Sequence, residues 1–117
     1  MSWSWPWARG PEGDEARAHG ALEGRERRYL RYSGRVQAVG FRYAATMVAE
    51  AAGVTGWVRN RADGDVEAEV QGLPEQLDAF ERGIEERSLS DETWIRAVLV
   101  AREFRAPVEE EGFSVRY

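Results

Sequence analysis

The order of strand-like and helix-like runs constrains the fold of this chain more than any other feature. Strand-like runs place apolar side chains at alternate positions, whereas helix-like runs repeat them every three or four residues. In chain order they predict a strand, a helix, two strands joined by a tight turn, a second helix and two further strands, the last of them short. The runs lie at 28–36, 41–53, 54–60, 65–72, 73–87, 93–104 and 112–117.

Both helix-like runs carry an apolar stripe along one face. Gly53 stands where a left-handed glycine ends many helices, and Pro74 suits the first position of the second helix. The run at 93–104 is apolar at both parities, which predicts a strand covered by its surroundings. We expect Trp57 and Trp94 to serve in packing. The two stripes consist of Phe41, Ala44, Ala45, Val48, Ala49 and Ala52, and of Leu77, Phe80 and Ile84.

This order of elements predicts an α+β fold of the split β-α-β kind, with both helices on one face of an antiparallel sheet. In that arrangement the first two strands are parallel and the third lies between them. The carboxyl ends of the first two strands therefore open on the same edge of the sheet. The turn Gln37–Arg42 follows the first strand and Asn60 ends the second. We expect these two segments, distant in sequence, to be neighbours in space.

Composition favours one globular domain. The 117 residues allow one modest core, and 43% hydrophobic with 32% charged residues is typical of a soluble protein. No apolar run approaches the roughly 20 residues that span a bilayer, and we find no secretory leader. The absence of cysteine favours a cytoplasmic location. Residues 1–27 lack a sustained period, so we expect a disordered tail before a domain at 28–117.

The net charge of −5 argues against nucleic acid or an anionic membrane as a partner, and small size with an acidic surface agrees with a monomer. The segment 33–62 departs from this balance, because its single acid, Glu50, stands against four arginines. A locally positive zone favours a small anionic ligand. Because side chains alternate between the two faces of a strand, we expect Arg59 and Arg61 to face away from Asn60. They would then strengthen the local positive field without contacting the ligand. The four arginines are Arg35, Arg42, Arg59 and Arg61.

The turn "GRVQAVGFR", Gly34 to Arg42, has the composition of an anion cradle. A turn that leads into a helix presents unpaired backbone N–H groups at the positive end of the helix dipole. Gly40 allows close approach of an anion, and Arg42 can add two donors and a full charge. The Walker spacing and the dinucleotide-binding glycine pattern are both missing. The alternative is a tight turn with a helix-capping arginine, and the loop alone does not decide between the two.

Two long motifs resemble the signatures of the acylphosphatase family. "GRVQAVGFR" is similar to the first, glycine-x-valine-glutamine-glycine-valine-x-phenylalanine-arginine, and "GWVRNRADGDVEAEVQG", Gly56 to Gly72, is similar to the second. The likeness covers about residues 28 to 117. It implies a ferredoxin-like α/β sandwich that hydrolyses acyl phosphates to a carboxylate and inorganic phosphate. It also implies a reaction without metal, cofactor or covalent intermediate.

The resemblance implies a role for each matched residue. Arg42 corresponds to the phosphate-binding arginine and Asn60 to the asparagine that orients the attacking water. Ala38 departs from the family, which has glycine at this position. If a left-handed backbone is needed there, alanine costs roughly 1–2 kcal/mol and the cradle is strained. The backbone of the loop completes the cradle, at Gln37, Ala38, Val39, Gly40 and Phe41.

Three other functions remain open on the sequence alone. A domain of this kind can bind an acyl or carbamoyl phosphate without efficient turnover, as at the start of the much larger hydrogenase maturation proteins. An RNA-recognition domain shares the order of elements, but its base-stacking strand is aromatic, whereas the third strand here is acidic. A structural or interaction protein would use the tryptophans near the start of the chain, Trp3, Trp5 and Trp7.

Overall fold

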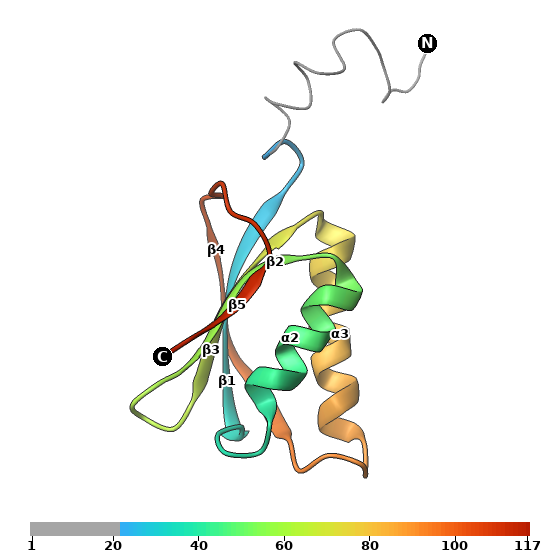
Figure 1. Ribbon diagram of the computed structural model, residues 1–117, viewed down its shortest axis with the longest axis vertical. Coiled ribbons are helices and arrows are strands. Elements are labelled where there is room, and N and C mark those ends of the chain that lie inside the picture. Colours follow the sequence, from blue (N-terminus) through green and yellow to red (C-terminus); the bar gives the residue numbers. More distant parts are fainter. Residues whose placement is uncertain (1–21) are drawn as a thin grey trace, which may run out of the picture.

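The computed structural model describes residues 22–117, and Figure 1 shows two helices packed against one twisted sheet. The order of the elements is the one that the periodicities predict. The elements are β1 (Glu26–Arg35), α2 (Phe41–Ala52), β2 (Thr55–Asn60), β3 (Val66–Gly72), α3 (Pro74–Leu89), β4 (Arg96–Arg105) and β5 (Phe113–Arg116). Neither helix is long and apolar enough to cross a membrane within this described part of the chain.

The five strands form a single sheet in the order β4-β1-β3-β2-β5. β1 lies antiparallel to both β3 and β4, and β2 lies antiparallel to β3. β5 pairs in parallel with β2, so the fifth strand makes the sheet mixed, where a wholly antiparallel sheet was expected. Both helices cover the same face, as predicted (Figure 1). The fold is thus the ferredoxin-like sandwich with one extra strand.

The helices form where the apolar stripes predict them, and the stripes are buried. Every stripe residue of α2 up to Ala49 is buried, as are the three stripe residues of α3. Gly53 ends α2 in the left-handed conformation, with φ 78°, and its N–H donates to the carbonyls of Ala49 and Glu50. Together with residues from β1, β2 and β3 these side chains form one hydrophobic core between the helices and the sheet.

The prediction of a covered fourth strand is wrong. β4 stands at the edge of the sheet, where Val98 and Val100 remain 60% and 52% exposed. An edge strand has one neighbouring strand, and the helices cover only one face of the sheet. The apolar side chains of β4 that point to the other face therefore stay in solvent. Trp94, which precedes β4, is 73% exposed and does not pack, whereas Trp57 is buried as expected.

The first strand begins at Glu26, two residues before the expected start of the domain. Arg27 is only 4% exposed and donates to the carboxylates of Glu69 and Glu110 and to the side-chain oxygen of Gln71. These contacts tie the start of β1 to β3 and to the loop before β5. The expectation of disorder covers residues 1–27; residues 26 and 27 belong to β1, and residues 1–21 lie outside the described residues.

Candidate active site

The loop between β1 and α2 has the backbone conformation of an anion cradle. Gly40 is left-handed, with φ 81° and ψ 17°, and Ala38 also has a positive φ, at 61°, although it is not a glycine. No acceptor among residues 22–117 forms a hydrogen bond with the N–H groups from Ala38 to Arg42. These donors lie at the start of α2, where the helix dipole adds a partial positive charge.

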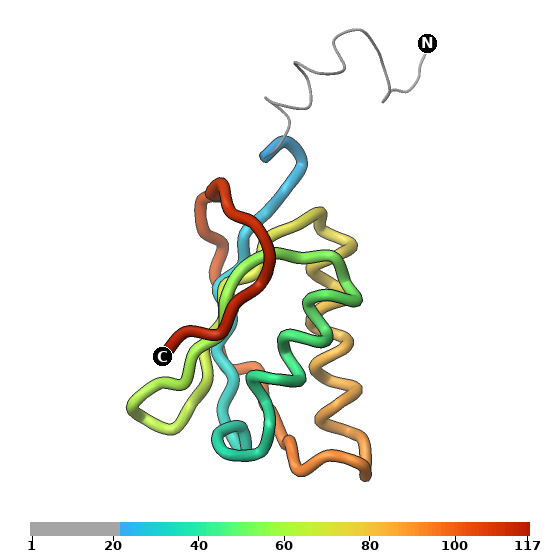
Figure 2. Tube along the Cα trace, viewed as in Figure 1, coloured from blue at the N-terminus to red at the C-terminus, as the bar shows by residue number. Residues whose placement is uncertain are grey.

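Gln37 fixes this loop to the turn between β2 and β3. Its side-chain Nε2 donates to the carbonyl oxygens of Arg61 and Asp65, at 2.8 and 2.9 Å. The turn after β1 and the end of β2 are therefore neighbours, as the topology predicts, and Figure 2 shows both turns at the same end of the sheet. The side-chain amide of Gln37 is thus engaged in positioning, a role that the motif alone does not reveal.

Arg42 lies in the first turn of α2 and is half-buried. Its guanidinium carbon lies 5.0 Å from the centre of the Tyr117 ring, and no carboxylate of the described residues forms an ion pair with it. A groove of about 480 Å³ opens beside it. The groove is lined by Val36, Ala38, Gly40, Phe41, Arg42, Tyr43, Thr46, Val115 and Tyr117. Since no lining residue is acidic, the charge of Arg42 remains available to an anion.

Asn60 is the last residue of β2, at the same end of the sheet. Its Oδ1 atom is buried and has no hydrogen-bond partner among residues 22–117. Because β2 pairs in parallel with β5, with Arg59 opposite Arg116, Tyr117 follows at the level of Asn60. Asn60 does not line the groove itself, but Tyr117, which Arg42 contacts, stands next to it in the sheet register. The orphaned oxygen can accept a hydrogen bond from a water molecule.

Two other arginines of the positive segment, Arg59 and Arg61, are engaged elsewhere. Arg59 and Arg61 both form ion pairs with Glu67, at 2.5 and 3.2 Å, and Arg61 also pairs with Asp63. Burial raises the pKa of Glu67, but hydrogen bonds from Tyr29, Arg59 and Arg61 outweigh it and leave the pKa below its ordinary value. These two arginines are therefore neutralised by ion pairs, where the sequence led us to expect field without contacts.

Within residues 22–117, no three His, Cys, Asp or Glu side chains gather closely enough to hold a metal ion. The loop and its surroundings offer the groups already described. These are backbone donors, one unpaired guanidinium and one amide oxygen, a set suited to binding an oxyanion and orienting a neutral molecule beside it.

Comparisons with known proteins identify the family of this chain. The profile of the acylphosphatase family matches residues 28–115. A curated "Acylphosphatase 1" of Ralstonia nicotianae is 58% identical over 53 residues, which cover 45% of this chain and 52% of that protein. An acylphosphatase of Thermococcus kodakarensis is 53% identical over 56 residues, covering 48% and 62% of the two chains. The aligned segments thus span about half to three fifths of these curated relatives.

Solved structures extend the likeness over most of the described chain. An acylphosphatase from Bacillus subtilis superposes with a TM-score of 0.61 at 28% identity, covering 79% of this chain and 99% of that one. An acylphosphatase from Coxiella burnetii superposes with a TM-score of 0.60 at 27% sequence identity, and the match covers 80% of this chain and 95% of that one. Full-length HypF, in a phosphate- and nucleotide-bound form, superposes with a TM-score of 0.61 at 26% sequence identity, and the match covers 12% of its length. With its profile match over residues 28–115, this chain belongs to the acylphosphatase family.

Proposed function

We propose that this protein is an acylphosphatase, which hydrolyses the carboxyl–phosphate bond of small acyl phosphates. The observation that carries the proposal is the unpaired guanidinium of Arg42 beside the free N–H groups of the loop at the start of α2. A phosphoryl group offers oxygens in a geometry that matches these donors. Family membership and the identity to curated acylphosphatases support the same activity.

In the proposed reaction the loop and Arg42 hold the phosphoryl group, and a water molecule attacks the phosphorus in line. The bond between phosphorus and the bridging oxygen breaks, and that oxygen leaves with the carboxylate. The attacking water becomes part of inorganic phosphate and releases a proton to solvent or to a phosphate oxygen. A carboxylate is a good leaving group, so binding, charge neutralisation and orientation suffice for catalysis.

Asn60 has the role of orienting the water. Its amide oxygen can accept a hydrogen bond, and it is buried without a partner from residues 22–117 at the edge that the loop shares. Arg42 neutralises charge on the equatorial oxygens of the phosphoryl group. We assign the backbone from Gln37 to Phe41 to the cradle, with the side chain of Gln37 holding the loop in place.

We also propose that the protein is cytoplasmic and monomeric, and that it binds neither nucleic acid nor membranes. The absence of cysteine and the net charge of −5 support these assignments. The second candidate function is a phosphate-binding module with little turnover. It is favoured by the likeness to part of HypF and by alanine at the left-handed position 38.

A turnover assay tests the proposal. Benzoyl phosphate is hydrolysed at neutral pH with a chelator present, and the wild-type chain is compared with Arg42→Ala and Asn60→Ala. We expect each variant to lose about 100-fold or more in kcat/KM, because each removes one transition-state contact. Arg82→Ala is the matched control, since Arg82 is also on a helix without an ion pair among the described residues but does not line the groove. Phosphate binding without turnover by the wild type would favour the binding module instead.

A further inference from the structure

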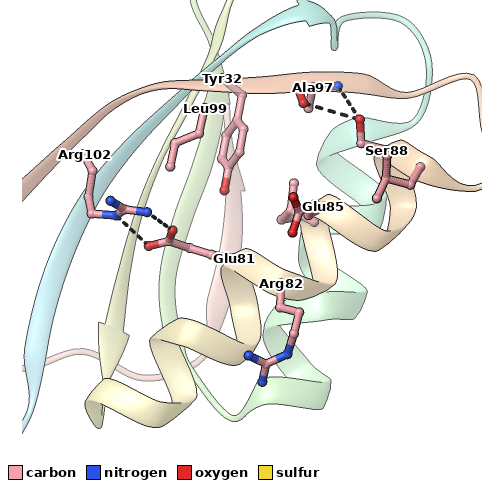
Figure 3. Close-up of a pocket in the computed structure, with 10 residues that line it drawn as sticks. Tyr32, Glu81, Arg82, Glu85, Ser88, Ala97, Leu99 and Arg102 are labelled. Carbon is pink, nitrogen blue, oxygen red and sulfur yellow. Dashed lines mark hydrogen bonds and ion pairs between the residues drawn. The ribbon is translucent and has the colours of Figure 1, made fainter.

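A second pocket lies between α3 and β4, away from the loop (Figure 3). Its volume is about 450 Å³. None of its lining residues lines the groove beside Arg42. It is lined by Tyr32, Glu81, Arg82, Ile84, Glu85, Ser88, Leu89, Ala97, Leu99 and Arg102. The lining combines aliphatic side chains with a few polar groups, which is the usual composition of a small-molecule site.

Tyr32 supplies the unusual feature of this pocket. The residue is only 4% exposed, and the centre of its ring lies 5.4 Å from the centre of the Phe41 ring. Its hydroxyl oxygen is buried, has no hydrogen-bond partner among residues 22–117, and is directed into the pocket in Figure 3. Burial raises the pKa of this hydroxyl, so it stays neutral at physiological pH. Buried hydroxyls normally have a partner, so this hydroxyl has the capacity for a hydrogen bond to a molecule in the pocket.

Most of the other polar groups in the pocket are already satisfied. Glu81 accepts hydrogen bonds from Arg28, at 2.9 Å, and from Arg102. The hydroxyl of Ser88 donates to the carbonyl of Ala97 and accepts from its N–H at 2.8 Å. These groups hold α3 against β4 and have little capacity left for a ligand.

Two charged groups of the lining have no ion pair among the described residues, Arg82 and Glu85. In Figure 3 the guanidinium of Arg82 points away from Tyr32, whereas Glu85 lies between Tyr32 and Ser88. Of these two groups, the carboxylate of Glu85 is therefore the one on the side of the buried hydroxyl. An anionic ligand at Tyr32 would meet this carboxylate, and a cation would be attracted to it.

We propose that this pocket binds a small primary or secondary organic ammonium with an apolar body. The ammonium group donates one hydrogen bond to the hydroxyl oxygen of Tyr32 and another to the carboxylate of Glu85. The apolar body packs on the aliphatic side chains of Ile84 and Leu99. Ammonium groups are donors only, and both of these oxygens can accept.

The probe is the phenethylammonium ion, titrated into the full ¹⁵N-labelled chain while amide resonances are recorded. We expect shifts that saturate and that concentrate on residues 82–89 and 97–102. 3-Phenylpropionate and 2-phenylethanol carry similar bodies with a negative and a neutral head group, and we expect both to bind at least about fivefold more weakly. Equal binding of all three compounds, or no saturable shift with the amine, would overturn the proposal.

Three variants locate the contacts. Tyr32→Phe keeps the ring and should weaken amine binding about three- to tenfold. Glu85→Gln should weaken it about two- to fivefold, because it removes the charge at an exposed carboxylate. Glu86→Gln is the matched control, since Glu86 is the next exposed acid on α3 and does not line the pocket. Unchanged affinity in Tyr32→Phe, or equal losses in the two glutamine variants, would show that the assigned contacts are wrong.

Discussion

Replacing Ala38 with glycine tests whether the loop is strained in this protein. Ala38 has φ 61°, a left-handed backbone that costs an alanine roughly 1–2 kcal/mol relative to glycine. Glycine also gains freedom in the unfolded chain, which lowers stability by about 0.4–1 kcal/mol. The net expectation for Ala38→Gly is a gain of about 0–1.6 kcal/mol in the free energy of unfolding, measured by urea denaturation.

The matched control is Ala106→Gly, at an exposed alanine in the loop before β5 whose φ is not positive. This variant has no strain to relieve, so it should lose about 0.4–1 kcal/mol. If Ala38→Gly loses as much stability as Ala106→Gly, then position 38 is not strained and the reasoning fails. Strain that appeared only with phosphate bound would give no such gain in stability and would instead let Ala38→Gly tighten inhibition by inorganic phosphate, by up to about tenfold.

Three further predictions concern the supports of the site and the fold. Gln37→Ala removes both hydrogen bonds to the β2–β3 turn, so it should lower the free energy of unfolding by about 1–2 kcal/mol and weaken inhibition by inorganic phosphate. A loss of stability with unchanged phosphate inhibition would contradict the positioning role of Gln37. Gly83→Ala should cost about 1–3 kcal/mol in urea denaturation, because an added Cβ would lie 2.6 Å from Cγ1 of Val48. Val48→Ala in the same protein should recover part of that loss, and no recovery would count against the contact. For Glu81, burial raises the pKa, but bonds from two arginines outweigh it and leave the folded pKa below 4.5. The unfolded chain therefore takes up the proton first, and the stability that Glu81 contributes is lost as pH falls below that value. The difference in unfolding free energy between wild type and Glu81→Gln should shrink between pH 7 and pH 3, and a constant difference would refute it.

Periodicity predicted the order of elements because the helices bury a single stripe each and the hairpin strands alternate. Gly53 could be placed as a helix end because the left-handed conformation selects glycine. The proximity of the loop and Asn60 followed from topology, since the ends of the first two strands must share an edge. These features depend on local chemistry or on the order of strands, and both are present in the sequence.

Other features depend on which strand lies beside which. The apolar residues of β4 give the same pattern in an interior strand as in an edge strand, so its exposure could not be predicted. The same holds for the parallel pairing of β5 with β2. The hydrogen bonds of Gln37 go to carbonyls 24 and 28 residues away, and the orphaned hydroxyl of Tyr32 arises from packing against α3 and β4. No short motif encodes such contacts.

The most direct test of the proposed mechanism is hydrolysis of benzoyl phosphate by the full chain in water enriched with ¹⁸O, followed by mass analysis of both products. Attack of an oriented water on a phosphoryl group held by Arg42 and the loop predicts that the label enters inorganic phosphate and that benzoate stays unlabelled. Label in benzoate would mean attack at the carbonyl carbon, and absence of turnover above buffer would mean that the site only binds. Either result would contradict a loop built to hold phosphorus for attack.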